Sequence, residues 1–200
     1  NGLDIKKWVK LNLVDFITVA PHWICDPNMP VKEFRKDLGN NKIPIYSTID
    51  GGQFQPYENR THGILRAVAS NYHFQGTDGI YIFNYWFNDR DIKKSEEELA
   101  KNPSDVATYR NSKLLMELGA PEKMVKKNKL YTLSDGTQET SYRHETPFPI
   151  FVSAWEEYKV KLNIPEDFKA NKPEFIYLFL RGTKDSKFKV KVNGQFVDST

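Results

Sequence analysis

Three short apolar runs each end in polar or aromatic residues, and this repetition constrains the fold more than any other feature of the chain. The runs are Leu13 to Val19, Ile43 to Ile49 and Gly79 to Phe83. Nearly continuous runs of Ile, Val, Phe and Tyr are typical of strands that are buried on both faces of a parallel sheet. Helix-like segments separate them, so the sequence predicts repeated β-α-β units.

Four segments have the apolar spacing and the end signals of helices: Asp4 to Asn12, Val31 to Leu38, Thr61 to Gln75 and Ser104 to Leu118. The second follows Pro30 and stops at Gly39, which are favoured residues at a helix start and just past a helix end. A closed (β/α)8 barrel needs about 250 residues. Because residues 1–120 carry only three predicted strands, we expect them to form a partial (β/α) barrel.

The last third of the chain loses the helical period. Short β-type runs replace it at Lys129 to Leu133, Phe148 to Val152, Glu157 to Leu162, Phe175 to Leu180 and Lys187 to Val192. Alternating polar and apolar residues in these runs favour antiparallel strands with one solvated face, and Asn193-Gly194 is a strong hairpin signal. We therefore predict an α/β plus all-β protein, in which a linker at 121–128 joins the barrel part to an antiparallel, jelly-roll-like β-sandwich at 129–200.

Composition excludes several classes of function. The net charge is only +3, with 29 basic and 26 acidic residues interspersed, so no nucleic-acid partner is expected. No apolar run reaches the ~18 residues of a membrane span. The lone Cys25 cannot make an intramolecular disulfide framework. No clustered His/Cys pattern and no glycine-rich phosphate loop occurs, so the sequence predicts no metal and no cofactor.

Polar and aromatic residues gather just past the predicted strands, where chemistry collects in parallel sheets. Sugar rings pack their C–H faces on aromatic rings while their hydroxyl groups bond to polar side chains, so a sugar cleft needs both kinds of residue. Trp86 fits stacking on a sugar and packing under the β module about equally well. The candidate substrate-binding residues are His22, Trp23, Gln53, Asn84 and Trp86.

Three stretches resemble the C-terminal half of glycoside-hydrolase-like (β/α)8 barrels found in carbohydrate-active proteins of bacteria. They are GLDIKKWVKLNLVDFITVAPHW from Gly2, PIYSTIDGGQF from Pro44 and NYHFQGTDGIYIFNYW from Asn71. The β-rich segment is similar to the accessory domain that often follows such barrels. The resemblance implies a carbohydrate ligand and a secreted or extracytoplasmic bacterial protein.

Asp50 is the carboxylate that the sequence places at a strand end. It is the candidate catalytic acid or base, or a sugar-hydroxyl acceptor, but it equally suits a turn ahead of Gly51-Gly52. Asp15 and Asp78 open their strands and are interpreted as structural. Glycosidases need two carboxyl groups, so whether the parent protein is an enzyme stays open and this chain alone is expected to be inactive.

Two functions follow from these patterns. The first is a part of a glycoside hydrolase that acts on or binds polysaccharide, with its cleft at the carboxyl ends of the parallel strands. The alternative is a non-catalytic carbohydrate-binding or structural module. Three parallel strands also leave two open sheet edges, and open edges favour pairing with a second copy as a homo-oligomer or coverage by the terminal segments of the same chain.

Overall fold

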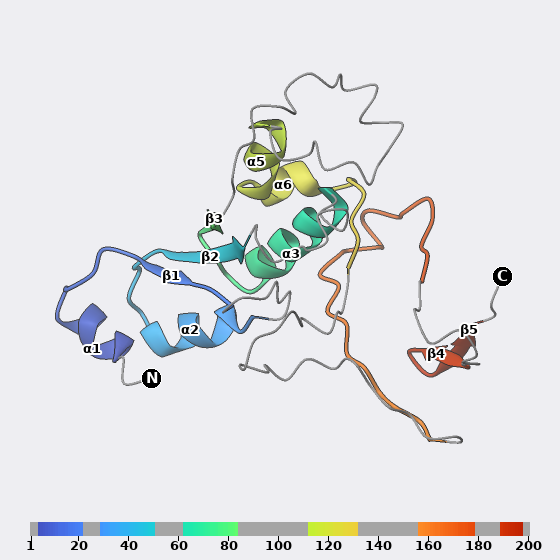
Figure 1. Cartoon of the computed structure of the whole chain (residues 1–200), viewed down its shortest axis with the longest axis horizontal. Coiled ribbons are helices and arrows are strands. Elements are labelled where there is room, and N and C mark those ends of the chain that lie inside the picture. The colour runs from blue at the N-terminus through green and yellow to red at the C-terminus, as the bar shows by residue number, and fades with distance from the viewer. Residues whose placement is uncertain are drawn as a thin grey trace.

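The computed structural model describes residues 4–21, 29–50, 62–83, 112–131, 156–178 and 189–197. Within them the chain forms short helices and strands in the order drawn in Figure 1. The elements are α1 (Ile5–Lys10), β1 (Ile17–Val19), α2 (Val31–Leu38), β2 (Ile45–Asp50), α3 (His62–Phe74), β3 (Gly79–Phe83), α5 (Ser112–Leu118), α6 (Pro121–Met124), β4 (Val190–Val192) and β5 (Gln195–Val197).

The predicted parallel sheet is confirmed. Its strand order is β1-β2-β3, and both neighbouring pairs are parallel. Ile17 lies opposite Ile45, and Tyr46 lies opposite Gly79. Since α2 connects β1 to β2 and α3 connects β2 to β3, the described part of the α/β region contains two consecutive β-α-β units.

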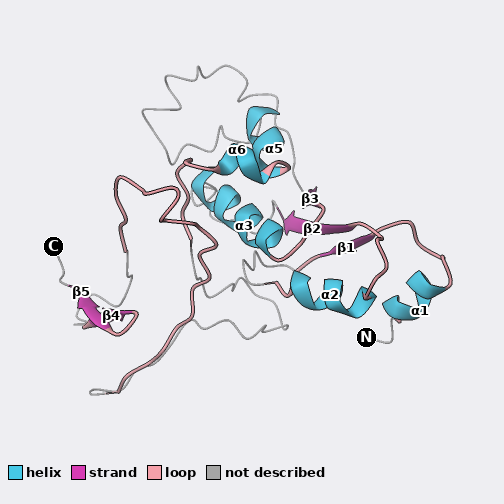
Figure 2. Ribbon diagram, turned by 180° about the vertical axis from the view of Figure 1, so that it is seen from behind, coloured by secondary structure: helices cyan, strands magenta, loops and turns pink. Residues whose placement is uncertain are grey.

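Helices cover one face of this sheet, and the hydrophobic core lies between them and the strands (Figures 1 and 2). Ile45 and Ile49 of β2 are fully buried there, together with Val31 of α2 and Tyr72 of α3. Leu114 and Leu118 of α5 extend the same core. The alternation of side chains along a strand therefore puts every second residue of β2 into the core and the others on the opposite face.

Strand β1 is shorter than predicted, because the first residues of the predicted run close the end of α1. The Leu13 amide donates to the Trp8 carbonyl at 2.9 Å, and Asn12 has a left-handed φ of 53°. Leu13 is 64% exposed as a result. The run from Leu13 to Ile17 thus turns the chain into the sheet, and the strand proper begins at Ile17.

The predicted linker contains a packed helix. Pro121 occupies the first turn of α6, where its missing N–H costs no hydrogen bond. Met124 is 1% exposed and belongs to the core cluster. Residues 121–124 are therefore a packed extension of the α/β region. The first part of the predicted helix Ser104 to Leu118 lies outside the described residues, and α5 is its second half.

The C-terminal third has less strand than predicted. Residues 129–131, 157–162 and 175–178 are irregular, and the run Phe148 to Val152 lies outside the described residues. The predicted Asn-Gly hairpin is confirmed, because β4 and β5 pair antiparallel around Asn193 and Gly194. Both turn residues have positive φ, 51° and 84°, as a tight hairpin turn requires. The described fold is thus mixed, with a three-stranded parallel and a two-stranded antiparallel sheet.

Candidate functional site

The carboxyl edge of the parallel sheet is the candidate site, because the three strands end there side by side. Strand β1 ends at Val19, β2 at Asp50 and β3 at Phe83. Asp50 lies opposite Phe83, whereas Val19 lies opposite Ser47. Strands β2 and β3 therefore end level, and β1 stops three residues earlier along the sheet. The edge is stepped, and Asp50 ends the central strand of the described sheet.

The structure places the predicted site residues only in part. The backbone of Asp50 is the last residue of β2, as a strand-end role requires, and its side chain is outside the described part. His22, Trp23, Gln53, Asn84 and Trp86 lie outside the described residues. Asn84 directly follows β3, and His22 follows Val19 by three positions. The strands that precede these residues end at one edge of the sheet, and the placement of the five residues there stays a prediction.

Aromatic side chains dominate the sheet face that α2 and α3 leave uncovered. Tyr81 and Phe83 of β3 are 49% and 46% exposed, while Ile80 and Ile82, on the other face, pack against the core. Phe16 lies just before β1 and contacts Tyr46 of β2 edge to face, with ring centroids 5.6 Å apart. We call these four aromatic residues, together with Thr18, Thr48 and Gly79, the open face. None of these seven residues is charged, and Asp50, which follows Thr48 by two positions on β2 and lies opposite Phe83, is the acidic position next to them.

One polar group on the open face has no protein partner in the described part of the chain. Thr48 lies on β2, two positions after Tyr46 and opposite Tyr81 of β3, and its side chain is 2% exposed. Its hydroxyl oxygen makes no hydrogen bond. A buried hydroxyl group without a partner costs about 1–3 kcal/mol. A bound water or a ligand hydroxyl group would remove that cost.

The buried hydroxyl of Thr77 is fully used, in contrast to that of Thr48. Its oxygen accepts from the Ser47 amide at 3.1 Å and from the Ser47 hydroxyl at 2.9 Å. It also lies 2.9 Å from the carbonyl oxygens of Ile45 and Gly79, to one of which its single proton can be donated. Thr77 thereby ties the start of β3 to β2 on the core side.

Arg35 and Asp78 close the opposite, amino end of the sheet. The Arg35 guanidinium on α2 donates to the Ile43 carbonyl at 3.1 Å and to the Gly76 carbonyl at 2.9 Å, and it pairs with the Asp78 carboxylate. Asp78 also accepts from the Ile45 amide at 2.7 Å. Although desolvation raises the pKa of Asp78, the Ile45 N–H and the Arg35 charge outweigh it and lower the pKa. The interpretation of Asp78 as structural is confirmed.

A second polar cluster, which the sequence analysis did not identify, joins residues 129–131 to 163–167. The Tyr131 hydroxyl donates to Glu166 at 2.5 Å, and the Lys129 ammonium lies 3.0 Å from the same carboxylate. Burial, followed by the hydrogen bond to Glu166, raises the pKa of Tyr131. Asn71 of α3 donates to the Asn163 carbonyl at 3.2 Å. These contacts fasten the irregular segment to α3 and α6, and we assign the cluster a structural role.

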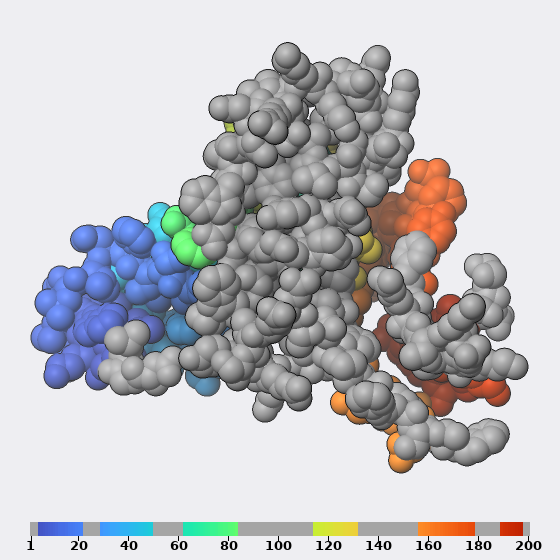
Figure 3. Space-filling model, in the orientation of Figure 1, coloured from blue at the N-terminus to red at the C-terminus, as the bar shows by residue number. Residues whose placement is uncertain are grey.

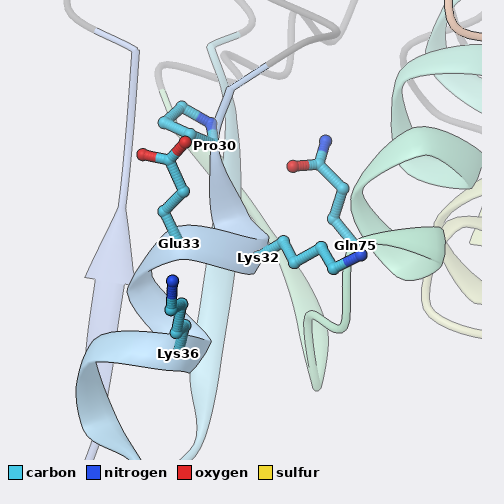
Figure 4. A pocket seen from close by; sticks show the side chains of 5 residues that line it. All are labelled: Pro30, Lys32, Glu33, Lys36 and Gln75. Atoms are coloured by element: carbon cyan, nitrogen blue, oxygen red, sulfur yellow. The ribbon is translucent and has the colours of Figure 1, made fainter.

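A surface groove lies between α2 and the end of α3. Figure 4 shows its lining, in which Lys32 extends toward Gln75 and the side chains of Pro30, Glu33 and Lys36 complete the wall. The lining consists mainly of long, flexible charged or amide side chains, and no strand-end residue contributes to it. The groove is therefore separate from the carboxyl edge.

No group of His, Cys, Asp or Glu within the described ranges has an arrangement that could hold a metal ion. Among the helices that the structure describes, none is long and apolar enough to cross a bilayer. A scan against protein-family models and a search of curated proteins found no match to the chain.

Proposed function

We propose that the chain is part of a glycoside-hydrolase-like protein and that the carboxyl edge of β1, β2 and β3 binds carbohydrate. In this proposal the parallel sheet belongs to a partial (β/α) barrel, and the C-terminal third belongs to a β-sandwich module. The observation that carries it is the strand order β1-β2-β3 with all strands parallel. Because the three strands are parallel neighbours, the segments that follow them, which bear His22, Gln53 and Asn84, start from the same edge of the sheet.

The aromatic character of the sheet supports a sugar ligand over a charged one. The open face next to this edge has four aromatic side chains, and the acidic position beside it is Asp50 at the end of β2. Phe83 ends β3 on this face and is 46% exposed, so an aromatic surface continues up to the strand ends. Flat, uncharged rings suit the C–H faces of neutral sugars, and hydroxyl groups of the ligand need the polar residues that follow the strands.

Binding without hydrolysis is the form of the proposal that the described residues favour. Hydrolysis of a glycosidic bond uses two carboxyl groups across the bond. Among the described residues, Asp50 is the acidic residue at the carboxyl edge, while Asp78 is engaged at the opposite end with Arg35. With a second carboxylate from elsewhere in the protein, Asp50 would serve as the acid or base. Without one, it is a hydroxyl acceptor.

The test is a calorimetric titration of neutral oligosaccharides against the wild-type chain, Trp86→Ala and Phe74→Ala. Phe74 is a matched control, because it is 76% exposed at the end of α3, remote from the strand ends. A stacked aromatic is worth about 0.5–1.5 kcal/mol beyond its buried area, so Trp86→Ala should weaken binding by up to about tenfold. Equal affinity for all three proteins would move the site elsewhere, and no binding by the wild type would refute the proposal.

A parallel assay separates binding from hydrolysis. Release of reducing ends from the same oligosaccharides should be undetectable for the wild-type chain if it only binds. If release is detected, Asp50→Asn should abolish it while leaving binding measurable. Release that survives Asp50→Asn would show that Asp50 is not the catalytic group.

A further inference from the structure

In the part of the chain that the structure describes, strand β3 is an outer strand of the parallel sheet, and its five residues include no charged residue and no proline. Among the residues that the structure describes, β3 has one strand neighbour, β2. Its sequence is Gly-Ile-Tyr-Ile-Phe, and its atoms reach the surface in Figure 3, where they are green. Natural edge strands are commonly protected by Lys, by Pro or by being very short. β1 is protected by its length of three residues, whereas β3 has five and lacks such protection.

The sequence of β3 is complementary to itself when two copies run antiparallel. Ile80 and Ile82 flank Tyr81 symmetrically. A two-fold axis at Tyr81 therefore puts Ile80 of each copy opposite Ile82 of the other copy. The same axis puts Phe83 opposite Gly79. Two-fold symmetric interfaces require this property, because the same patch must fit itself.

The faces also match in such a pair. An axis perpendicular to the sheet keeps the open faces of both copies on one side and the helices on the other. A Cβ atom at Gly79 would lie 2.9 Å from the ring of Tyr46, so that ring covers Gly79. Phe83 of the second copy would therefore meet the Tyr46 ring, and an aromatic residue across from a glycine is a recognised way to stabilise an edge.

Charge favours a second copy over a charged partner. The five residues of β3, from Gly79 to Phe83, are uncharged, so a charged partner gains no attraction along this edge. Two copies bring no like charges into contact at this edge, and the whole chain carries only +3. From these observations we infer that two copies of this chain pair antiparallel through β3 about Tyr81 and form one continuous six-stranded sheet.

Sedimentation equilibrium of the full chain tests the pairing. The wild type should have twice the 23.3 kDa mass of one chain. Tyr81→Lys places two ammonium groups side by side at the axis and should raise the dissociation constant about tenfold or more. Phe16→Lys is the matched control, because Phe16 lies on the same open face and is similarly exposed at 55%, but is separated from β3 by β2. It should leave the dimer intact.

A disulfide trap tests the geometry independently of any loss of folding in Tyr81→Lys. In a Cys25→Ser background, Tyr81→Cys faces itself across the axis, where directly opposite Cβ atoms lie about 4.5–5.5 Å apart, near disulfide range. Mild oxidation should cross-link Tyr81→Cys at least about tenfold faster than Phe16→Cys, because thiol exchange needs the two sulfur atoms in contact. A wild type that is monomeric at every concentration, or equal cross-linking of both variants, would overturn the inference.

Discussion

Replacing Thr48 by Val should stabilise the fold, although most substitutions of buried residues destabilise it. Thr48 is 2% exposed on β2 and its hydroxyl oxygen has no hydrogen-bond partner in the part of the chain described. The unfolded chain hydrates that hydroxyl group, so folding strips it of water without replacement. Val has nearly the same shape and removes the desolvation cost, while its added methyl group gains burial.

The size of the effect follows from the cost of an unpaired buried hydroxyl group. That cost is about 1–3 kcal/mol, so Thr48→Val should raise the free energy of unfolding by about 1–2 kcal/mol, in the lower part of this range. For a chain of this length, the midpoint of thermal unfolding should rise by about 2–8 °C. Urea titration followed by circular dichroism measures the free energy, with an unchanged slope against denaturant as a check on the native state.

The neighbouring Thr77→Val supplies the control, with the opposite sign. Thr77 is also buried, but its hydroxyl receives the Ser47 amide and hydroxyl at 3.1 and 2.9 Å. Its loss leaves a buried N–H unpaired and should cost about 2–3 kcal/mol. If Thr48→Val instead destabilises the chain by as much as Thr77→Val, then the Thr48 hydroxyl has a partner and the reasoning about the open face is wrong.

Two further predictions concern pH. The lowered pKa of Asp78 means that its carboxylate stabilises the fold above the ordinary value of 3.8, and this contribution is lost as the pH falls through the lower folded-state pKa. The urea midpoint of Asp78→Asn should therefore fall less steeply between pH 6 and pH 2 than the midpoint of the wild type. The raised pKa of Tyr131 has the opposite effect on stability. Its neutral hydroxyl group stabilises the fold below the ordinary value of 10.0, and this contribution is lost as the pH rises above that value. Tyr131→Phe should therefore flatten the alkaline limb of the same curve, and an unchanged limb would contradict the assignment of the Tyr131–Glu166 contact.

Local signals explain which elements were predictable. Helix α2 has the predicted bounds, Val31 to Leu38, because Pro30 precedes it and Gly39, with a φ of 58°, ends it. The hairpin was predictable for the same reason, since Asn193 and Gly194 adopt the positive φ that its turn needs. In such cases a few neighbouring residues determine the backbone, and distant contacts only reinforce it.

Pairing explains which elements were not predictable. Residues 157–162 alternate polar and apolar side chains as a strand does, but a strand exists only where a neighbour supplies backbone hydrogen bonds, and the structure describes these residues as irregular. At the site, the end of β2 at Asp50 could be read from the apolar run. The unpaired Thr48 hydroxyl and the Arg35 contacts could not, because they depend on segments up to 43 positions apart in the sequence.

The Arg35 contacts have an evolutionary consequence. One guanidinium serves the end of the α2–β2 loop, the α3–β3 turn and a carboxylate 43 positions away. Lysine has a single ammonium group and cannot reach three acceptors spread over a plane. A change at Arg35 removes its contacts to two carbonyl groups and to Asp78 together, and a change at Asp78 removes the ion pair, so the effect of a substitution at one position depends on the residue at the other. In a library of variants selected for folding, positions 35 and 78 should therefore covary more strongly than positions that touch through apolar packing alone.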